Sequence, residues 1–235
     1  MRIGNTDISA YNARQSTYTP GHQSISNDSQ WITGAARPFF DRNKLGFRTF
    51  SVKLIVKGSD REDINRNVSN ILAALMNETE ITIDGFDHTF TALLKSYKHD
   101  ETSMRRWHRL TLTFEGFEHG VHTTMSGDTS FTINNPGNIV SPCAVSLRSS
   151  VNVSDVKING VCRDSAGNEK TIVVTNMTAN KTVIIDGITG LIEEDGELKD
   201  GITLSALPTL VPGSNPITCN KAEVTVGIDV LPMYM

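Results

Sequence analysis

Apolar and polar residues alternate with a period of two over much of the chain, which is typical of β-strands. The clearest example starts at Phe47 and continues to residue 56. Its apolar face is made of every second residue: Phe50, Val52, Leu54 and Val56. Ser51 and Lys53 fall on the other face. The pattern therefore predicts a strand over residues 47–56 with one apolar and one polar face.

One segment, residues 59–77, has the period of a helix instead. Its apolar residues recur every three or four positions: Ile64, Val68, Ile71, Leu72, Leu75 and Met76. Ser59 followed by Glu62 has the spacing of a capping box, and Asp60 and Asp63 add negative charge to the first turn, where the helix dipole favours it. We predict a helix over residues 59–77 that begins at N-cap Ser59 and packs its apolar stripe against a sheet.

The rest of the first half predicts further strands. Residues 81–94 have a strand pattern interrupted by the hairpin-type turn Asp84-Gly85. After a polar break, residues 107–114 alternate again between apolar and polar positions. The first half is thus predicted to be a small α+β unit with one helix and a largely antiparallel sheet.

Residues 1–46 are polar and rich in turns, with apolar residues scattered among them. A stretch of this length is too long for a simple loop in a compact domain. We predict one or two short strands followed by an extended arm. The aromatic residues Trp31, Phe39 and Phe40 indicate that part of this arm docks on something.

The second half has no convincing helical period. Short apolar runs are separated by turn signals such as Asn159-Gly160, Asp186-Gly187 and Asp195-Gly196. The runs lie at residues 131–133, 139–147, 151–158, 172–174, 183–185 and 224–228. This pattern predicts an antiparallel β-sandwich. The protein is therefore expected to be mainly β, with a helix-containing domain at residues 1–125 and a sandwich at residues 126–235.

Composition narrows the class of protein. The chain has 235 residues and a net charge of −4, with no basic stripe of the kind that nucleic-acid binding requires. No apolar stretch approaches a membrane span, and no signal peptide is visible. The three cysteines have wide spacings that fit neither a disulfide framework nor a zinc site. We interpret them as reduced, small apolar residues in a reducing compartment: Cys143, Cys162 and Cys219.

Residues that could carry out chemistry are few. The tightest histidine pair, His119 and His122, lies in the polar segment that connects the two halves of the chain. No third ligand is nearby, so no metal site is predicted. The densest acidic cluster, residues 193–195, falls at a predicted hairpin tip, where carboxylates are usually solvated. The second half contains few aromatic rings for sugar stacking, and Phe131 and Tyr234 are interpreted as structural. We predict neither catalysis nor a cofactor.

The order of these segments resembles the distal tail proteins of long-tailed bacteriophages over nearly the whole length. The resemblance rests on a series of short segments: residues 44–46, the strand 47–56, Asp60-Arg61, residues 83–85, 107–116, 134–138, 156–160, 183–187 and 208–215, and the strand around Val226. Residues 12–38 and the last five residues match the family poorly.

The resemblance implies a structural role in the phage tail, in a protein assembled in the bacterial cytoplasm and located in the virion. The N-terminal domain would form a ring, with six copies expected from the family, that continues the tail tube. The C-terminal domain would be a galectin-like sandwich that projects outward. The expected partners are other copies of the chain, the tail tube protein, a tail-associated lysin or tail spike, and receptor-binding proteins. Within this ring, Trp31, Phe39 and Phe40 are candidates for a strap between neighbouring subunits.

Three other functions stay open at this point. The sandwich of a tail-tip protein could bind host cell-wall carbohydrate, although the scarcity of aromatic residues argues against it. A wall hydrolase would need an acid pair that the sequence does not supply. A tail tube subunit has a single domain, which leaves no place for the second half of this chain.

Overall fold

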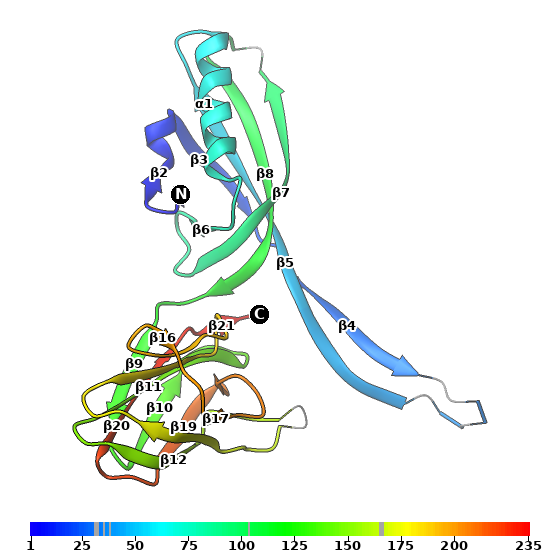
Figure 1. The fold of residues 1–235 in the computed structure, drawn as a ribbon. Coiled ribbons are helices and arrows are strands. Elements are labelled where there is room, and N and C mark those ends of the chain that lie inside the picture. The colour runs from blue at the N-terminus through cyan, green and yellow to red at the C-terminus, as the bar shows by residue number, and fades with distance from the viewer. Residues whose placement is uncertain (31–32, 35, 38, 103, 165–166) are drawn as a thin grey trace. The chain divides into compact units, whose positions relative to one another are not determined.

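The computed structural model describes residues 1–30, 33–34, 36–37, 39–102, 104–164 and 167–235, with the backbone alone for residues 28, 30 and 39–42. The chain divides into two compact units, Met1–Glu118 with Met235, and His119–Tyr234 (Figure 1). Both units are built from antiparallel strands, and the described residues contain one α-helix. The prediction of a mainly β fold with one helix is therefore confirmed.

The first unit is one sheet with the strand order β2-β1-β6-β7-β8-β5-β3, and β4 pairs with β5 in addition. The strands are β1 (Arg2–Ile3), β2 (Thr6–Asp7), β3 (Ala13–Thr19), β4 (Gln23–Gln30), β5 (Phe39–Lys57), β6 (Thr79–Thr82), β7 (Thr89–Glu101) and β8 (Trp107–His119). A short 3-10 helix, η1 (Ile8–Tyr11), follows β2. Residues 1–46 therefore contain more strand than the sequence predicts.

Helix α1 (Arg61–Ala74) belongs to this unit (Figure 1), and its apolar stripe is part of the core. The predicted apolar face of β5 is fully buried, as is the alternating face of β8. These core residues are Phe50, Val52, Leu54, Val56, Leu110, Leu112 and Phe114. Phe50 stacks on Phe114 with a ring-centroid distance of 5.1 Å. Met76, predicted to belong to the stripe, is 76% exposed because the helix ends at Ala74.

The start of α1 differs by one residue from the predicted capping box. Asp60 is the N-cap, and its Oδ1 accepts the Asp63 backbone N–H at 2.9 Å. The Asp63 carboxylate in turn accepts the backbone N–H of Ser59 at 2.9 Å. The Ser59 N–H, as the largest cause, and the Arg66 guanidinium hold the pKa of the Asp63 carboxyl below its usual value. The prediction of Ser59 as N-cap is therefore wrong: Asp60 caps the helix, and the carboxylate of Asp63 returns to the N–H of Ser59, one residue before the N-cap.

The second unit is an antiparallel sandwich of two sheets with a shared apolar core. One sheet has the order β10-β19-β12-β13-β17 and the other β16-β15-β14-β11-β20-β9, with β18 pairing to β11. The strands of these two sheets are β9 (Thr123–Gly127), β10 (Ser130–Asn135), β11 (Ser141–Ser149), β12 (Val153–Asn159), β13 (Ile172–Met177), β14 (Thr182–Asp186), β15 (Ile192–Glu194), β16 (Glu197–Leu198), β17 (Ile202–Thr203), β18 (Thr209–Leu210), β19 (Gly213–Cys219) and β20 (Val224–Val230). A last short strand, β21 (Met233–Tyr234), belongs to neither sheet. The predicted sandwich is thus confirmed.

Turn chemistry explains how such short strands stay in register. Asp195 and Gly196, which connect β15 to β16, both have positive φ, at 52° and 84°. Two such residues form the tight turn whose twist matches that of the flanking strands. After β14, the Asp186 carboxylate accepts the Ile188 backbone N–H at 2.7 Å. Two of the turn signals identified in the sequence, Asp186-Gly187 and Asp195-Gly196, are therefore real turns.

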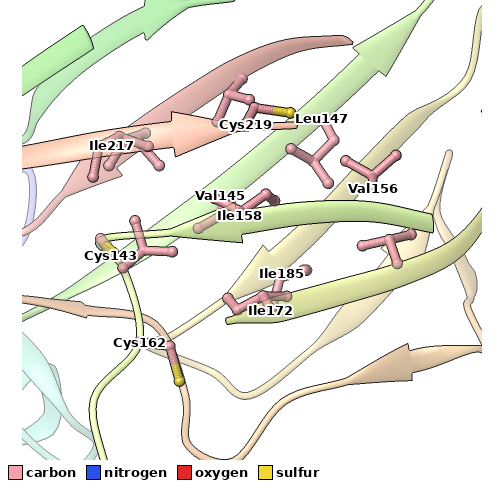
Figure 2. Packing of buried hydrophobic residues seen from close by; sticks show 14 of the residues in the cluster. Cys143, Val145, Leu147, Val156, Ile158, Cys162, Ile172, Ile185, Ile217 and Cys219 are labelled. Carbon is pink, nitrogen blue, oxygen red and sulfur yellow. The ribbon is translucent and has the colours of Figure 1, made fainter. Parts of the chain in front are cut away.

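The three cysteines are free and buried, and they belong to the sandwich core (Figure 2). Burial raises the pKa of the Cys143 thiol to about 12, so it stays protonated at neutral pH. Burial also raises the pKa of the Cys219 thiol. The interpretation of these residues as small apolar side chains is confirmed.

The identity of the N-cap residue of α1 can be tested by comparing Asp60→Ala with Ser59→Ala. Asp60→Ala removes the acceptor for a helix N–H and is expected to cost about 1 kcal/mol of stability, whereas Ser59→Ala should cost a few tenths. Both tryptophans lie in the first unit, so urea unfolding followed by tryptophan fluorescence measures the relevant transition. A larger loss for Ser59→Ala would restore Ser59 as the cap.

Candidate assembly surface

A two-stranded ribbon extends from the sheet of the first unit (Figure 1). β8 pairs with β5 only from Arg48 to Lys57, whereas β4 pairs with the earlier part, from Arg48 back to Phe39. Residues 39–47 of β5 therefore have β4 as their strand partner. We call β4 together with residues 39–47 the arm. The sequence predicted an arm, but it placed the start of the strand at Phe47 instead of Phe39.

The arm carries apolar side chains in solvent. Ile25 and Leu45 lie opposite each other in the ladder, and Phe47 lies two residues farther along β5, within the register shift between the Ile25–Leu45 and Gln23–Arg48 pairs. Their exposed fractions are 58% for Ile25, 43% for Leu45 and 61% for Phe47. We call these three residues the arm strip. Contiguous exposed apolar residues of this kind mark interaction sites in soluble proteins.

An apolar groove opens at the base of the arm. It has a volume of about 320 Å³ and is lined by Phe47 and Glu78, residues 91–95 of β7 and residues 115–117 of β8. Leu93, in its wall, is 51% exposed. The Lys95 ammonium and the Glu115 carboxylate, also in the lining, form an ion pair at 3.1 Å. We call this feature the root groove.

A buried ionic group fixes the arm to the sheet. Arg48, at the residue where β5 leaves β8, pairs with Glu118, whose side chain is 5% exposed. Glu118 Oε1 also lies 2.5 Å from His88 Nδ1, and Arg48 Nε donates to the Gly21 carbonyl at 2.8 Å. A Cβ at Gly21 would lie 1.4 Å from the Thr49 carbonyl oxygen, so only glycine fits there. These contacts bind the turn before β4, the start of the β5–β8 ladder and the end of β8 to one another.

Tyr18 extends this base with an aromatic cluster. Its ring lies 5.6 Å from the Phe86 ring and 6.1 Å from the Phe90 ring, measured between centroids. Burial raises the pKa of the Tyr18 hydroxyl, against a smaller opposing effect of the Arg48 charge. The Tyr18 side chain is therefore neutral, and its contribution to the base is packing.

Part of the sheet edge next to the groove is unpaired. β6 pairs with β7 only at residues 89–92, with Thr79 opposite Ala92. Past Ala92 no other strand among the described residues pairs with this side of β7, although β7 continues to Glu101. An unpaired strand edge is a template for pairing with another chain. The edge begins at Leu93, the residue that also lines the root groove.

The candidate strap residues are only partly placed. Phe39 and Phe40 lie in the arm portion of β5, where their backbones are opposite Gln30 and Ser29. Trp31 lies outside the described residues. The structure thus brings two of the three candidates into the arm strand, and their role as a strap stays a prediction. The arm strip and root groove were missed, because they depend on strand pairing that a local pattern does not show.

The acidic cluster of the second unit has a structural role. Glu194 accepts the Thr178 backbone N–H at 2.9 Å and the Lys199 ammonium at 3.0 Å, and its side chain is 15% exposed. Partial burial alone would raise its pKa, but these partners hold the pKa below its usual value. Asp195 accepts the Thr182 N–H at 2.9 Å. The expectation of a solvated cluster is therefore wrong for Glu194, because its carboxylate links β15 to neighbouring segments.

His119 and His122, in the segment that connects the two predicted domains, have different partners. His122 Nδ1 lies 3.0 Å from an Asp229 carboxylate oxygen, and His119 Nδ1 lies 3.0 Å from the Gly120 carbonyl. Across the described ranges, no group of three or more His, Cys, Asp or Glu residues is arranged to hold a metal ion. Over the same ranges, no helix has the length and hydropathy needed to span a bilayer.

Comparison with known proteins gives a match in structure only. The sequence matches no family model and no curated protein. The structure is similar to the Dit protein of phage SPP1, described as a paradigm of the hub adsorption apparatus in phages that infect Gram-positive bacteria. The TM-score is 0.75 at 15% identity, over 97% of this chain and 96% of that chain.

A chain of the phage P2 baseplate in its activated conformation also matches, with a TM-score of 0.50 at 11% identity, over 96% of this chain and 92% of that chain. Both likenesses extend over nearly the full length. The fold implied by the resemblance to distal tail proteins is therefore confirmed.

The ionic group at the arm base makes a testable contribution to stability. Glu118→Gln leaves the Arg48 charge without its buried partner and is expected to destabilise the first unit by about 3 kcal/mol. Lys95→Met is the matched control, because Lys95 and Glu115 are more exposed and such surface pairs contribute about 0–1 kcal/mol. Urea unfolding followed by tryptophan fluorescence measures both. Equal losses in the two variants would show that Arg48 and Glu118 do not stabilise the base.

Proposed function

We propose that this protein is a hub at the distal end of a long phage tail, where copies of the chain form a closed ring. The ring would join the tail tube to the proteins of the tail tip. One observation carries this proposal: a full-length fold shared with the SPP1 Dit protein also presents an arm and an open strand edge that a single copy leaves uncovered.

A single copy of the chain exposes two surfaces that favour association, the arm and the open edge of β7. A two-stranded ribbon is marginally stable in water, and its unpaired edges invite association with other strands. The arm and the open edge of β7 are different surfaces of one unit. Contacts between different surfaces are head-to-tail, and such contacts produce rings when the rotation between copies closes. A ring of about six copies is the number expected from the family.

The two units would divide the work of the hub. The first unit would supply the ring and its contact with the tail tube protein. The second, as a galectin-like sandwich, would present a surface to a tail-associated lysin or tail spike and to receptor-binding proteins. The protein would assemble in the host cytoplasm and remain in the virion. Free, buried cysteines suit assembly in a reducing compartment.

Carbohydrate recognition by the sandwich has weaker support. Sugar sites commonly use exposed aromatic rings, and the aromatic residues of the second unit are Phe131 and Tyr234. Phe131 packs against the sandwich core, and a Cβ at Gly127 would lie 2.6 Å from its ring. Phe131 is therefore a structural residue. A glycan array would separate the two functions, since a hub without sugar recognition gives no signal.

The ring is tested on the full chain by analytical ultracentrifugation and negative-stain imaging, alone and with the tail tube protein. We expect closed rings of about six copies. A matched variant removes the arm by replacing residues 24–47 with an Asn-Gly turn between the paired residues Gln23 and Arg48, which leaves strand β3 in place, and it should sediment as a folded monomer. A wild-type chain that stays monomeric at all concentrations and with the tube protein would contradict the hub.

A further inference from the structure

Four basic residues lie together on the face of the first sheet that is turned away from the core. The buried residues of β5 alternate with Lys53, Ile55 and Lys57, which therefore lie on the other face of the sheet. Ladder pairing places Arg14 of β3 on one side of Ile55 and Arg109 of β8 on the other. All four basic residues are exposed. We call Arg14, Lys53, Lys57 and Arg109 the cationic patch.

Strand pairing fixes the size of the patch. Arg14 and Arg109 lie on the two strands that flank β5, so their backbones are about 10 Å apart at the usual strand spacing. Lys53 and Lys57 are four residues apart, which is about 13 Å along β5. The Trp107 ring centre lies 4.7 Å from Lys57 Nζ and 5.6 Å from Arg14 Cζ. These contacts hold two of the cations in place and offset part of the repulsion among like charges.

The acidic residues of the neighbouring strands do not neutralise the patch. Among the described residues, no ion pair includes a residue of the cationic patch. Every acid of β7 and β8 has another basic partner: Asp100 pairs with Lys98, Glu101 with Arg61, Glu115 with Lys95 and Glu118 with Arg48. The patch thus presents four positive charges in a chain whose net charge is −4.

The surroundings of the patch indicate which anion it suits. Thr17 and Thr111 lie on either side of Lys53 in the ladder, and threonine hydroxyls donate to phosphate oxygens as Lys and Arg do. Duplex DNA carries about one charge per 1.7 Å of its axis, so a patch of this size meets several phosphates at once. Unpaired bases would need a free aromatic ring for stacking, and the Trp107 ring already contacts two cations. The phosphate backbone of a duplex therefore fits the patch better than unpaired bases do.

We propose that the cationic patch binds the phosphate backbone of duplex DNA without reading its sequence. The inference goes beyond the proposed hub, because the patch belongs to a single copy and exists without a ring. No basic stripe is visible along the sequence, since the four residues lie on three strands that only the fold brings together. In a ring, a duplex that meets several patches would be held more tightly than by one copy.

The salt dependence of binding tests the patch on the full chain, by fluorescence anisotropy with a short labelled duplex. Four phosphate contacts predict a slope of about −3.6 for the logarithm of affinity against the logarithm of salt concentration. This slope corresponds to a loss of roughly 150-fold between about 50 and 200 mM salt. Lys53→Gln with Arg109→Gln removes two of the contacts, so the slope should fall to about −1.8 and the affinity should decrease.

Arg148→Gln with Lys157→Gln is the matched control. It removes one arginine and one lysine from exposed strand positions of the second unit, so it changes the net charge by the same amount. This control should keep the wild-type slope and affinity. Each chain is first shown to unfold like the wild type in urea by tryptophan fluorescence.

Several outcomes would overturn the proposal. A patch variant that keeps the wild-type slope, or equal losses in the patch and control variants, would show that the patch does not hold the duplex. A wild type that binds no duplex at about 50 mM salt would refute it as well. If polyglutamate displaced the labelled duplex better than unlabelled duplex does at equal charge, the patch would belong to an acidic protein.

Sedimentation of the same samples separates this result from that for the hub. Rings that form without binding the duplex would refute the patch alone. Duplex binding by a chain that stays monomeric, alone and with the tail tube protein, would support the patch and contradict the hub.

Discussion

The architecture of the first unit depends on one continuous strand, β5, that serves two structures at once. It pairs with β8 from Arg48 onward and with β3 from Ser51 onward, and before Arg48 it is half of the arm. The change of partner occurs at a residue whose charge is buried against Glu118. Breaking a buried pair of this kind is costly, so the arm leaves the sheet at a fixed point and in a fixed direction.

The second unit obtains its stability in a different way. Its core is made of aliphatic residues and cysteines from two sheets, and the polar groups at its edges are satisfied locally. Glu194 and Asp195 illustrate this, since both carboxylates accept backbone N–H groups of neighbouring segments. Hydrogen bonds to ionised carboxylates hold strands that are only a few residues long.

Local patterns were enough to predict much of this fold, and non-local pairing explains what they missed. The faces of β5 and β8 and the stripe of α1 follow from periods within single segments, and the core confirms them. The N-cap was misplaced by one residue because Ser59 and Asp60 both precede an acid at the capping-box spacing. The beginning of β5 was missed because neither face of residues 43–46 packs in the core of its own chain, so these residues need not alternate. The root groove gathers residues from β5, β7 and β8 and has no signature in any one of them.

The fixed base of the arm has a consequence for assembly. Head-to-tail contacts give either a closed ring or an open filament, and the rotation between neighbouring copies decides which one forms. If the arm docks in a neighbour, the angle at which it leaves the sheet sets that rotation. A flexible base would allow a range of angles, and the same contact would then produce chains of mixed curvature. The ion pair of Arg48 and Glu118, the hydrogen bond from Arg48 to Gly21 and the close approach of Gly21 to Thr49 restrict this angle. The polar group at the base therefore fixes the direction in which the arm leaves the sheet.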